Sequence, residues 1–224
     1  MREKNGERRM DNNDETFEKW CKKAEVDYQL ANKLKAKIFP LLEGAHRKLS
    51  YRFDKAFIEH IKGTQIRHDN SKRILLLLHK KLNPQLFSLE EHAAITLHFE
   101  YLTLVEGIFA PEISFLIFTL IANGHPCSTR KGNNVKTLSD IEKVSLTSRL
   151  KFLRKHKFKK LTVKKAVKLR NSVAHLFYEI DDYGNIKVGD KTIAKAEYSK
   201  LYDDLRNVSY ALHLINRLYY KRFA

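Results

Sequence analysis

Three residues near the end of one predicted helix, Arg170, Asn171 and His175, have side chains that could act on a phosphodiester. A histidine can transfer a proton near neutral pH, and the planar guanidinium of an arginine can bind two phosphoryl oxygens at once. RNA carries its own nucleophile, the 2′-hydroxyl group, so its cleavage needs a proton-transferring group and a cation that stabilises the charged transition state. We therefore expect His175 to move the proton, Arg170 to hold the phosphoryl oxygens and Asn171 to orient one or the other.

The spacing of arginine and histidine is informative only in its context. Four pairs have four to six intervening residues, against about two expected by chance: Arg73/His79, Arg149/His156, Arg170/His175 and Arg206/His213. Asparagine follows the arginine in the last two pairs only. The alternative interpretation of any such pair is a structural hydrogen bond within a helix.

The segment 170–175 reads Arg-Asn-Ser-Val-Ala-His and resembles the R-N-x-x-A-H form of the R-x(4–6)-H motif of the HEPN superfamily of small all-α ribonucleases. A polar hairpin-like segment and a terminal amphipathic helix follow it, as in that family, and the resemblance covers about residues 88–224. It implies a metal-independent endoribonuclease without a cofactor, which acts on RNA as a homodimer. It also implies prokaryotic antiviral defence or toxin–antitoxin biology, with an antitoxin or another protein as a further partner.

Two interpretations from other classes remain beside this one. The first is a catalytically silent helical module that binds RNA or DNA. The second is a helical protein that holds a partner protein, with its charge serving solubility. The absence of phosphate-loop, dinucleotide-binding, zinc-protease and serine-hydrolase motifs removes the common alternatives among enzymes.

The positive charge of the chain is concentrated in one stretch. The formal net charge is +17, and residues 131–175 hold 14 basic and two acidic residues. Such a density suits contacts with phosphates. We expect neutralisation of Lys33, Lys35 and Lys37 to matter less for binding than neutralisation within this stretch. The predicted RNA-binding residues are Lys159, Lys160, Lys164, Lys165 and Lys168.

A helix over residues 161–178 places Arg170 in the middle of an apolar stripe that includes Val167 and Val173. Burying an unpaired guanidinium is costly, so Arg170 must reach water, meet a carboxylate, or lie at a cleft or subunit interface. Asn171 and His175 fall on another face of the same helix. This separation favours a dimer in which two motif helices complete one site.

The last helix has a polar stripe beside its apolar seam, formed by Arg206, Ser209, His213 and Asn216. A packed polar flank is one interpretation of this stripe. The other is a second wall of the site, with Arg206 and His213 as its functional residues.

The sequence predicts an all-α helical bundle, because helical apolar spacing is frequent while only four prolines and eight glycines interrupt it. A helical N-terminal region (1–86) and a HEPN-like domain (87–224) meet near Asn83-Pro84, and the first is either a partner-binding extension or part of one fused core. Gly107 and Pro111 should end or bend the helix that begins at 88. The other predicted elements are helices at 14–42, 44–61, 71–82, 139–155, 161–178 and 197–224, a loop at 128–136 and a small hairpin or loop at 179–194.

The remaining composition points to the cytoplasm. Two cysteines cannot make a disulfide framework, and no group of residues has metal-ligand spacing; His125 and Cys127 are interpreted as a loop. The N-terminus lacks the apolar segment of a secretory signal. The uninterrupted part of the most apolar stretch, Ile113 to Ala122, is about half as long as a membrane span, so no membrane association is expected.

Overall fold

The structure is a computed structural model, and it describes residues 15–81, 100–128, 134–161, 164–174, 178–181, 183 and 185–223. The side chains of residues 71–72, 74–81, 164–166 and 223 are not described. Over these residues the fold is all-α with small antiparallel sheets, which confirms the predicted class. After a helix at 15–23, the helices are α2 (Tyr28–Leu49), α3 (Tyr51–Lys81), the π-helix η2 (Thr103–Phe109), α5 (Ala110–Ala122), α6 (Leu138–Lys143), α7 (Leu146–Lys155), the 3-10 helix η3 (Lys159–Leu161), α8 (Lys164–Ala174) and α9 (Lys195–Phe223). The strands are β1 (Cys127–Ser128), β2 (Asn134–Val135), β3 (Glu179–Ile180), β4 (Ile186–Val188) and β5 (Lys191–Ile193).

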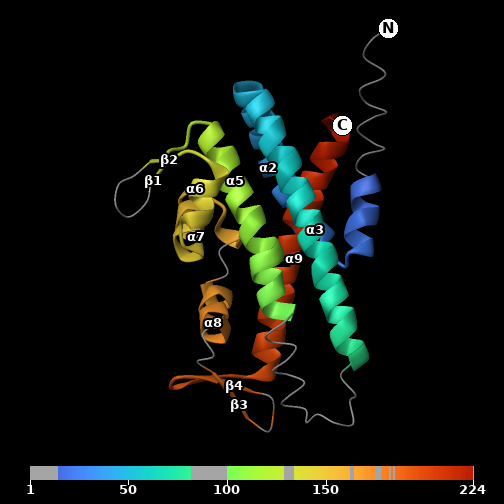
Figure 1. The fold of residues 1–224 in the computed structure, drawn as a ribbon, viewed down its shortest axis with the longest axis vertical. Helices are drawn as coiled ribbons and strands as arrows, with labels where there is room; N and C mark the ends of the chain where they lie inside the picture. The colour runs from blue at the N-terminus through green and yellow to red at the C-terminus, as the bar shows by residue number, and fades with distance from the viewer. Residues whose placement is uncertain are drawn as a thin grey trace.

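The long helices α2, α3, α5 and α9 run along the long axis of the molecule, and α6, α7 and α8 lie along one side of α5 (Figure 1). The sheet β3-β4-β5 lies at one end, next to the start of α9, where the sequence predicts a small hairpin or loop. The pair β1-β2 joins Cys127 to Val135 across the predicted polar loop. The side helices thus carry the basic stretch, while the long helices form the support behind it.

One hydrophobic core includes residues from both predicted regions. Phe17 and Leu34 belong to the same buried cluster as Leu212 and Leu218, and α2 packs along α9. Apolar surface removed from water is the main stabilising contribution to such a core. Residues 15–81 are therefore part of one fused core with the rest of the described chain, which is one of the two roles expected for the N-terminal region; Asn83 and Pro84 lie outside the described residues.

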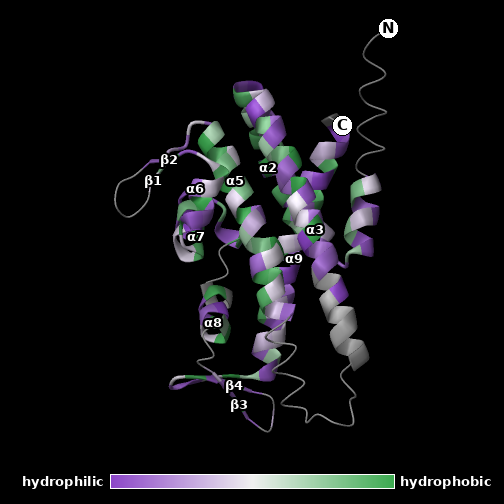
Figure 2. Ribbon diagram, in the orientation of Figure 1, coloured by the Kyte–Doolittle hydropathy of each residue, from purple (hydrophilic) through white to green (hydrophobic). Residues whose placement is uncertain are grey.

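Helix α5 is the most deeply buried element of the bundle. Every residue from Ala110 to Leu120 is buried, and much of the ribbon of this helix has the green of hydrophobic residues in Figure 2. A helix that is apolar on all sides belongs in a core or in a membrane. The helical stretch Thr103–Ala122 is long and apolar enough to span a membrane, but 83% of its most apolar window is buried inside the protein. It is consistent with the core helix of a soluble protein.

The first three predicted helices have different boundaries in the structure, because helix caps and residues with positive φ, rather than proline and glycine, set where these helices begin and end. The first helix ends at residue 23, Glu25 has a left-handed φ of 53°, and the Asp27 side chain caps α2 by accepting from the amide of Leu30. Helix α2 then continues through Pro40 and ends at Leu49, before Ser50 with a φ of 45°. Helix α3 has no interruption between residues 61 and 71.

The predicted end or bend of the helix at Gly107 and Pro111 takes the form of a π-helix rather than a break. The amide of Ala110 donates to the carbonyl of Val105, five residues earlier, and Pro111 lies in the first turn of α5. Proline is tolerated in a first turn, where its missing amide hydrogen is not needed. The chain thus stays helical from η2 into α5. This wider turn holds Glu106.

The predicted helix 139–155 consists of two helices with separate caps. Thr137 caps α6 through a capping box with Asp140, so this helix is capped two residues before the predicted start at 139. The chain leaves the helical conformation at Val144, and the Ser145 hydroxyl caps α7 by accepting from the amide of Ser148. This second start sets the rotation of α7, and therefore which of its residues face α8.

We expect Gly44→Ala to lower the free energy of unfolding by about 1–3 kcal/mol, because the space for a side chain is already occupied. A Cβ atom at Gly44 would lie 2.2 Å from the side-chain oxygen of Asn123. The side-chain nitrogen of Asn123 donates to the carbonyls of Leu41 (2.7 Å) and Thr119 (2.8 Å) and so joins α2 to α5. The control is Gly63→Ala in α3, where a Cβ would come no closer than 3.4 Å to Arg67. Urea denaturation should show a small gain for the control and a loss for Gly44→Ala; equal gains would contradict the prediction.

Candidate nucleic-acid interface

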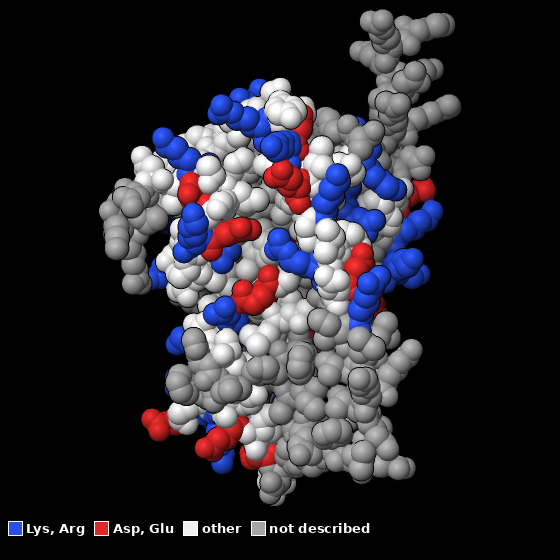
Figure 3. Space-filling view, viewed as in Figure 1, with Lys and Arg blue, Asp and Glu red and all other residues white. Residues whose placement is uncertain are grey.

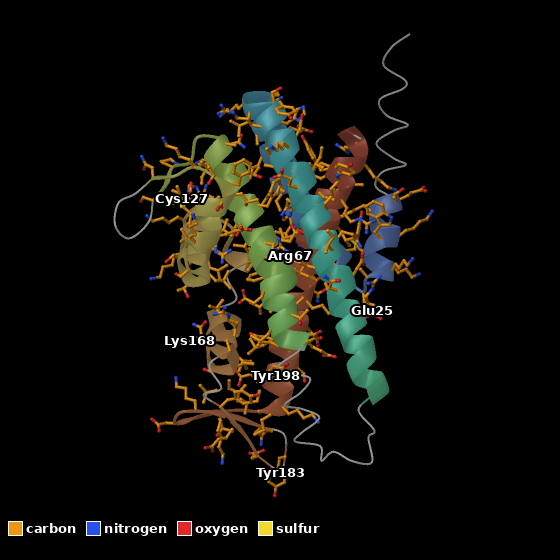
Figure 4. The ribbon with its side chains drawn as sticks, in the orientation of Figure 1. Glu25, Arg67, Cys127, Lys168, Tyr183 and Tyr198 are labelled. Carbon is orange, nitrogen blue, oxygen red and sulfur yellow. The ribbon has the colours of Figure 1, made fainter. Side chains whose placement is uncertain are left out.

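A cavity of about 570 Å³ lies between α7 and α8, and its polar wall is cationic. None of the described residues that line it is acidic. Lys168 lies on α8, on the side of the bundle opposite α3 (Figure 4). On the face of the molecule that Figure 3 shows, basic and acidic side chains are mixed. The basic residues that line the cavity, here called the α7/α8 groove, are Lys151, Arg154, Lys155, Lys159 and Lys168.

The helical period explains why these residues face one groove. Lys151 and Lys155 are four residues apart on α7 and lie on one face, as do Lys168 and Asn171, three apart on α8. Between the two helices, Lys157 has a left-handed φ of 66° that turns the chain, and buried Phe158 and Leu161 hold the segment against the core. The groove is therefore built on rigid elements rather than on a loop.

Arg170 meets a carboxylate, which was one of the three outcomes predicted for it. Its Nε donates to Oε1 of Glu106 at 2.5 Å, and its Nη2 contacts the same oxygen. The side chains of Arg170 and Glu106 are 30% and 49% exposed, so water still reaches the pair. The π-helix η2 supplies Glu106, so the widened helical turn places a negative charge directly against the predicted phosphate-binding arginine.

Asn171 links Arg170 to the groove. Its side-chain oxygen accepts a hydrogen bond from Nη1 of Arg170 at 2.9 Å, and the residue also lines the α7/α8 groove. Two of the three predicted catalytic residues are thus brought together, and Asn171 orients the guanidinium. His175 lies outside the described residues; helix α8 is described as far as Ala174.

The predicted RNA-binding lysines fall into three groups. Lys159 and Lys168 line the α7/α8 groove. Lys160 is exposed on η3 and lines another cavity, next to α2. Lys164 and Lys165 form the start of α8, and their side chains are outside the described set.

The two residues of the predicted second wall have partners of their own. Arg206 forms an ion pair with Glu25 at 2.7 Å, at the turn before α2 (Glu25 is labelled in Figure 4). His213 is buried in the centre of the bundle against Glu112. Of the stripe on α9, Ser209, His213 and Asn216 face inward. The role of Arg206 and His213 as a second wall of the site remains a prediction.

Arg149, which the spacing of arginine and histidine also singles out, is a buried structural residue. Its Nη1 donates to the carbonyl of Ala110 at 3.0 Å and contacts the hydroxyl of Ser114 at 2.5 Å. Burial lowers the pKa of Arg149 from the ordinary arginine value. Because Ala110 follows the π-helix directly, Arg149 fixes the junction of η2 and α5 to α7 and so places Glu106 near α8.

A buried polar cluster behind the interface was not predicted from the sequence. The Glu112 carboxylate of α5 lies 3.1 Å from Nε2 of His60, 3.1 Å from Nδ1 of His213 and 2.6 Å from the side-chain nitrogen of Asn216. An ionised carboxylate can only accept, so both histidine nitrogens that face it carry a hydrogen. The signals in the sequence are a glutamate inside an apolar stretch and the polar stripe of α9.

The electrostatics of this cluster keep Glu112 ionised. Burial alone raises the pKa of Glu112, but the charge of His60 and hydrogen bonds from His213 and His60 outweigh it and lower the pKa to about 2. The ring of His60 stacks on Phe115 with centroids 4.4 Å apart, which fixes the imidazole beside the carboxylate. The cluster joins α3, α5 and α9.

Within the described residues, no group of three or more histidine, cysteine, aspartate or glutamate side chains could hold a metal ion. Comparison with protein-family models, curated proteins and solved structures found no match for this chain. The geometry therefore defines an all-α protein with a cationic groove between two helices, and the arginine of its R-N-x-x-A-H segment lies beside that groove. A function must be argued from this site.

Proposed function

We propose that this protein is a metal-independent endoribonuclease of the HEPN type, which binds RNA in the α7/α8 groove and acts in the cytoplasm as a homodimer. The observation that carries the proposal is the groove itself, in which, among the described residues, five cationic residues and no acidic one line a cavity next to Asn171 and Arg170. Phosphates are the ligands that such a wall would hold. Prokaryotic defence or toxin–antitoxin biology follows from the resemblance to the family.

The proposed chemistry uses the RNA's own hydroxyl group. His175 removes the proton of the 2′-hydroxyl or returns one to the leaving group, and Arg170 stabilises the charge on the phosphoryl oxygens. The bond from O2′ to phosphorus forms as the bond from phosphorus to O5′ breaks, and O5′ takes up a proton. The products are a 2′,3′-cyclic phosphate and a 5′-hydroxyl. Asn171, hydrogen-bonded to Arg170, acts as a positioning residue.

A second candidate function is a catalytically silent RNA- or DNA-binding module, and the pair between Arg170 and Glu106 favours it. A guanidinium whose charge is offset by a carboxylate stabilises a transition state less than one that faces only phosphate. In this alternative, the groove binds nucleic acid and Arg170 serves the packing of α8 on η2.

Cleavage without metal separates the two functions. We expect labelled single-stranded RNA, incubated with the protein in EDTA, to be cut into fragments with 2′,3′-cyclic phosphate ends, because the 2′-hydroxyl is the nucleophile. RNA with 2′-O-methyl groups is the control and should stay intact while still binding. Binding without cleavage of either RNA would favour the silent module, and a requirement for a divalent metal would contradict the proposed mechanism.

The RNA-binding part of the proposal predicts that basic residues of the α7/α8 groove cause the salt dependence of RNA affinity. We expect Lys151→Gln, Lys155→Gln and Lys168→Gln together to reduce the slope of log affinity against log salt by about 2, since each phosphate contact with a single strand contributes about 0.7. The control removes three exposed charges from the helix at 15–23, on the opposite side of the molecule (Figure 1), through Lys19→Gln, Lys22→Gln and Lys23→Gln. Fluorescence anisotropy over a salt series measures both. Equal slopes for the two triple variants would show that the groove is not the binding surface.

A further inference from the structure

A second basic cavity, here called the α2/η3 groove, lies between α2 and residues 157–161. Its volume is about 480 Å³, and within the described part of the chain no acidic residue lines it. Its apolar wall includes Leu34, Phe158 and Leu161, all of them buried in the core. The basic residues of this groove are Lys33 and Lys37 from α2 with Lys157, Lys159 and Lys160.

The local structure places these lysines at fixed positions. Lys33 and Lys37 are four residues apart on α2 and lie on one face of the helix, next to the buried Leu34, which lines the same cavity. The left-handed turn at Lys157 and the buried side chains of Phe158 and Leu161 fix the facing segment. Lysines from two segments about 120 residues apart in the sequence thus line one cavity.

The two grooves are adjacent, because Lys159 lines both. Of the residues that the structure describes, nine basic ones and no acidic one line the two grooves together. Gathering this many like charges raises the free energy of the folded protein through repulsion, unless a polyanion binds there. Lysine is a compact charge with rotatable donors, which suits successive phosphates of a flexible strand better than one planar carboxylate.

We propose that the α2/η3 groove binds the phosphates of the same RNA strand beyond those held in the α7/α8 groove, so that the N-terminal helices supply part of the RNA-binding surface. This inference rests on the proposed binding of RNA between α7 and α8. It also changes the expectation for the N-terminal lysines: Lys33 and Lys37 contribute to binding. Lys35 does not, because its ammonium lies 5.0 Å from the ring centroid of Phe17, on another face of α2.

The test compares a short and a long RNA on the full chain. Oligouridylates of about four and about sixteen nucleotides, both 2′-O-methylated so that they cannot be cut, are titrated by fluorescence anisotropy at several salt concentrations. The test variant is Lys33→Gln with Lys37→Gln. The matched control, Lys22→Gln with Lys23→Gln, removes two exposed charges outside both grooves, and Lys35→Gln is a further control within α2.

We expect the test variant to weaken binding of the long RNA roughly tenfold and to lower its salt slope by about 1.4, while binding of the short RNA changes less than about twofold. The controls should bind both RNAs as the unchanged protein does. If the test variant binds the long RNA as the unchanged protein does, while the triple variant of Lys151, Lys155 and Lys168 binds it more weakly, the inference is overturned. The proposed function then still stands.

Three other outcomes would overturn the inference in different ways. Equal weakening of short and long RNA would make the α2/η3 groove the primary site rather than an extension. Displacement of RNA by polyglutamate of equal charge, at equal concentration, would indicate an acidic protein as the ligand of this surface. If the unchanged protein binds neither RNA at low salt, the proposed function fails as well.

Discussion

Replacing Glu112 by alanine is expected to lower the free energy of unfolding by about 3–5 kcal/mol, a large part of the total stability of a protein of this size. The carboxylate accepts hydrogen bonds from His60, His213 and Asn216 in a place with almost no access to water. Its removal leaves three buried donors without an acceptor and opens a cavity where α3, α5 and α9 meet. Both effects are costly inside a core.

The measurement is urea denaturation at neutral pH, followed by circular dichroism. The control is Glu59→Ala, which removes an exposed glutamate next to His60 on the same helix and should change stability by less than about 0.5 kcal/mol. Glu112→Gln tests the charge separately, because an amide keeps the size of the side chain but cannot accept from all three donors. An unchanged denaturation midpoint in Glu112→Ala would show that the cluster does not hold the three helices together.

The same carboxylate sets a pH dependence with a definite sign. The pKa of Glu112 is lowered from 4.5 to about 2 in the folded protein, so the unfolded chain takes up its proton first as the pH falls. The stabilisation is complete above about pH 4.5 and is lost progressively as the pH falls from 4.5 towards 2. In Glu112→Gln this part of the acid destabilisation should be absent.

Periodicity predicted the packing of the long helices, because burial follows the helical repeat. The seam predicted on the last helix contains Leu201, Leu205, Val208, Leu212, Ile215 and Tyr219; the last five are buried, and Leu201 is half-buried. The boundaries were less predictable. The first helix was expected to end at about residue 42, near Pro40, and the next to begin at Gly44, yet α2 continues through these positions. Pro40 is exposed, and Gly44 allows Asn123 to come close. Such an approach depends on a residue far away in the sequence.

The candidate site shows the same division between local and long-range information. The charge of residues 131–175 is visible in the sequence, and it does line the α7/α8 groove. Glu106 could not be identified as the partner of Arg170, since 64 positions separate them. The proximity of Lys33 and Lys37 to Lys157 likewise depends on how α2 packs. Local composition predicts which residues are available, and tertiary packing decides which of them meet.

The apolar stripe of α8 serves the core of the same chain. Val167 and Val173, which belong to the apolar stripe predicted around Arg170, are 6% and 0% exposed and belong to the main hydrophobic cluster. A charged residue at position 173 would therefore unfold the protein rather than report on dimerisation. Sedimentation of the unchanged protein at the assay concentration is the direct test of the proposed homodimer.

His175→Ala is expected to reduce the rate of RNA cleavage by roughly two to four orders of magnitude, because the reaction would lose the proton transfer proposed for this imidazole. Arg170→Ala should have a similar effect, since the phosphoryl charge would lose its cation. The denaturation midpoint and the RNA affinity of His175→Ala should stay close to those of the unchanged protein. Single-turnover cleavage of labelled RNA in EDTA measures the rate.

The control for this variant must be a histidine outside the buried cluster. His213→Ala would lower activity through stability alone, because His213 hydrogen-bonds to Glu112 in the core. His46 is a better choice: its side chain is 35% exposed, and its partner, Asp54 at 2.7 Å, is 43% exposed, so its loss costs little stability. His46→Ala should cleave RNA at the unchanged rate. Full activity in His175→Ala, or an equal loss in His175→Ala and His46→Ala, would show that His175 is not the proton-transferring group. The cationic groove would then be a binding surface alone.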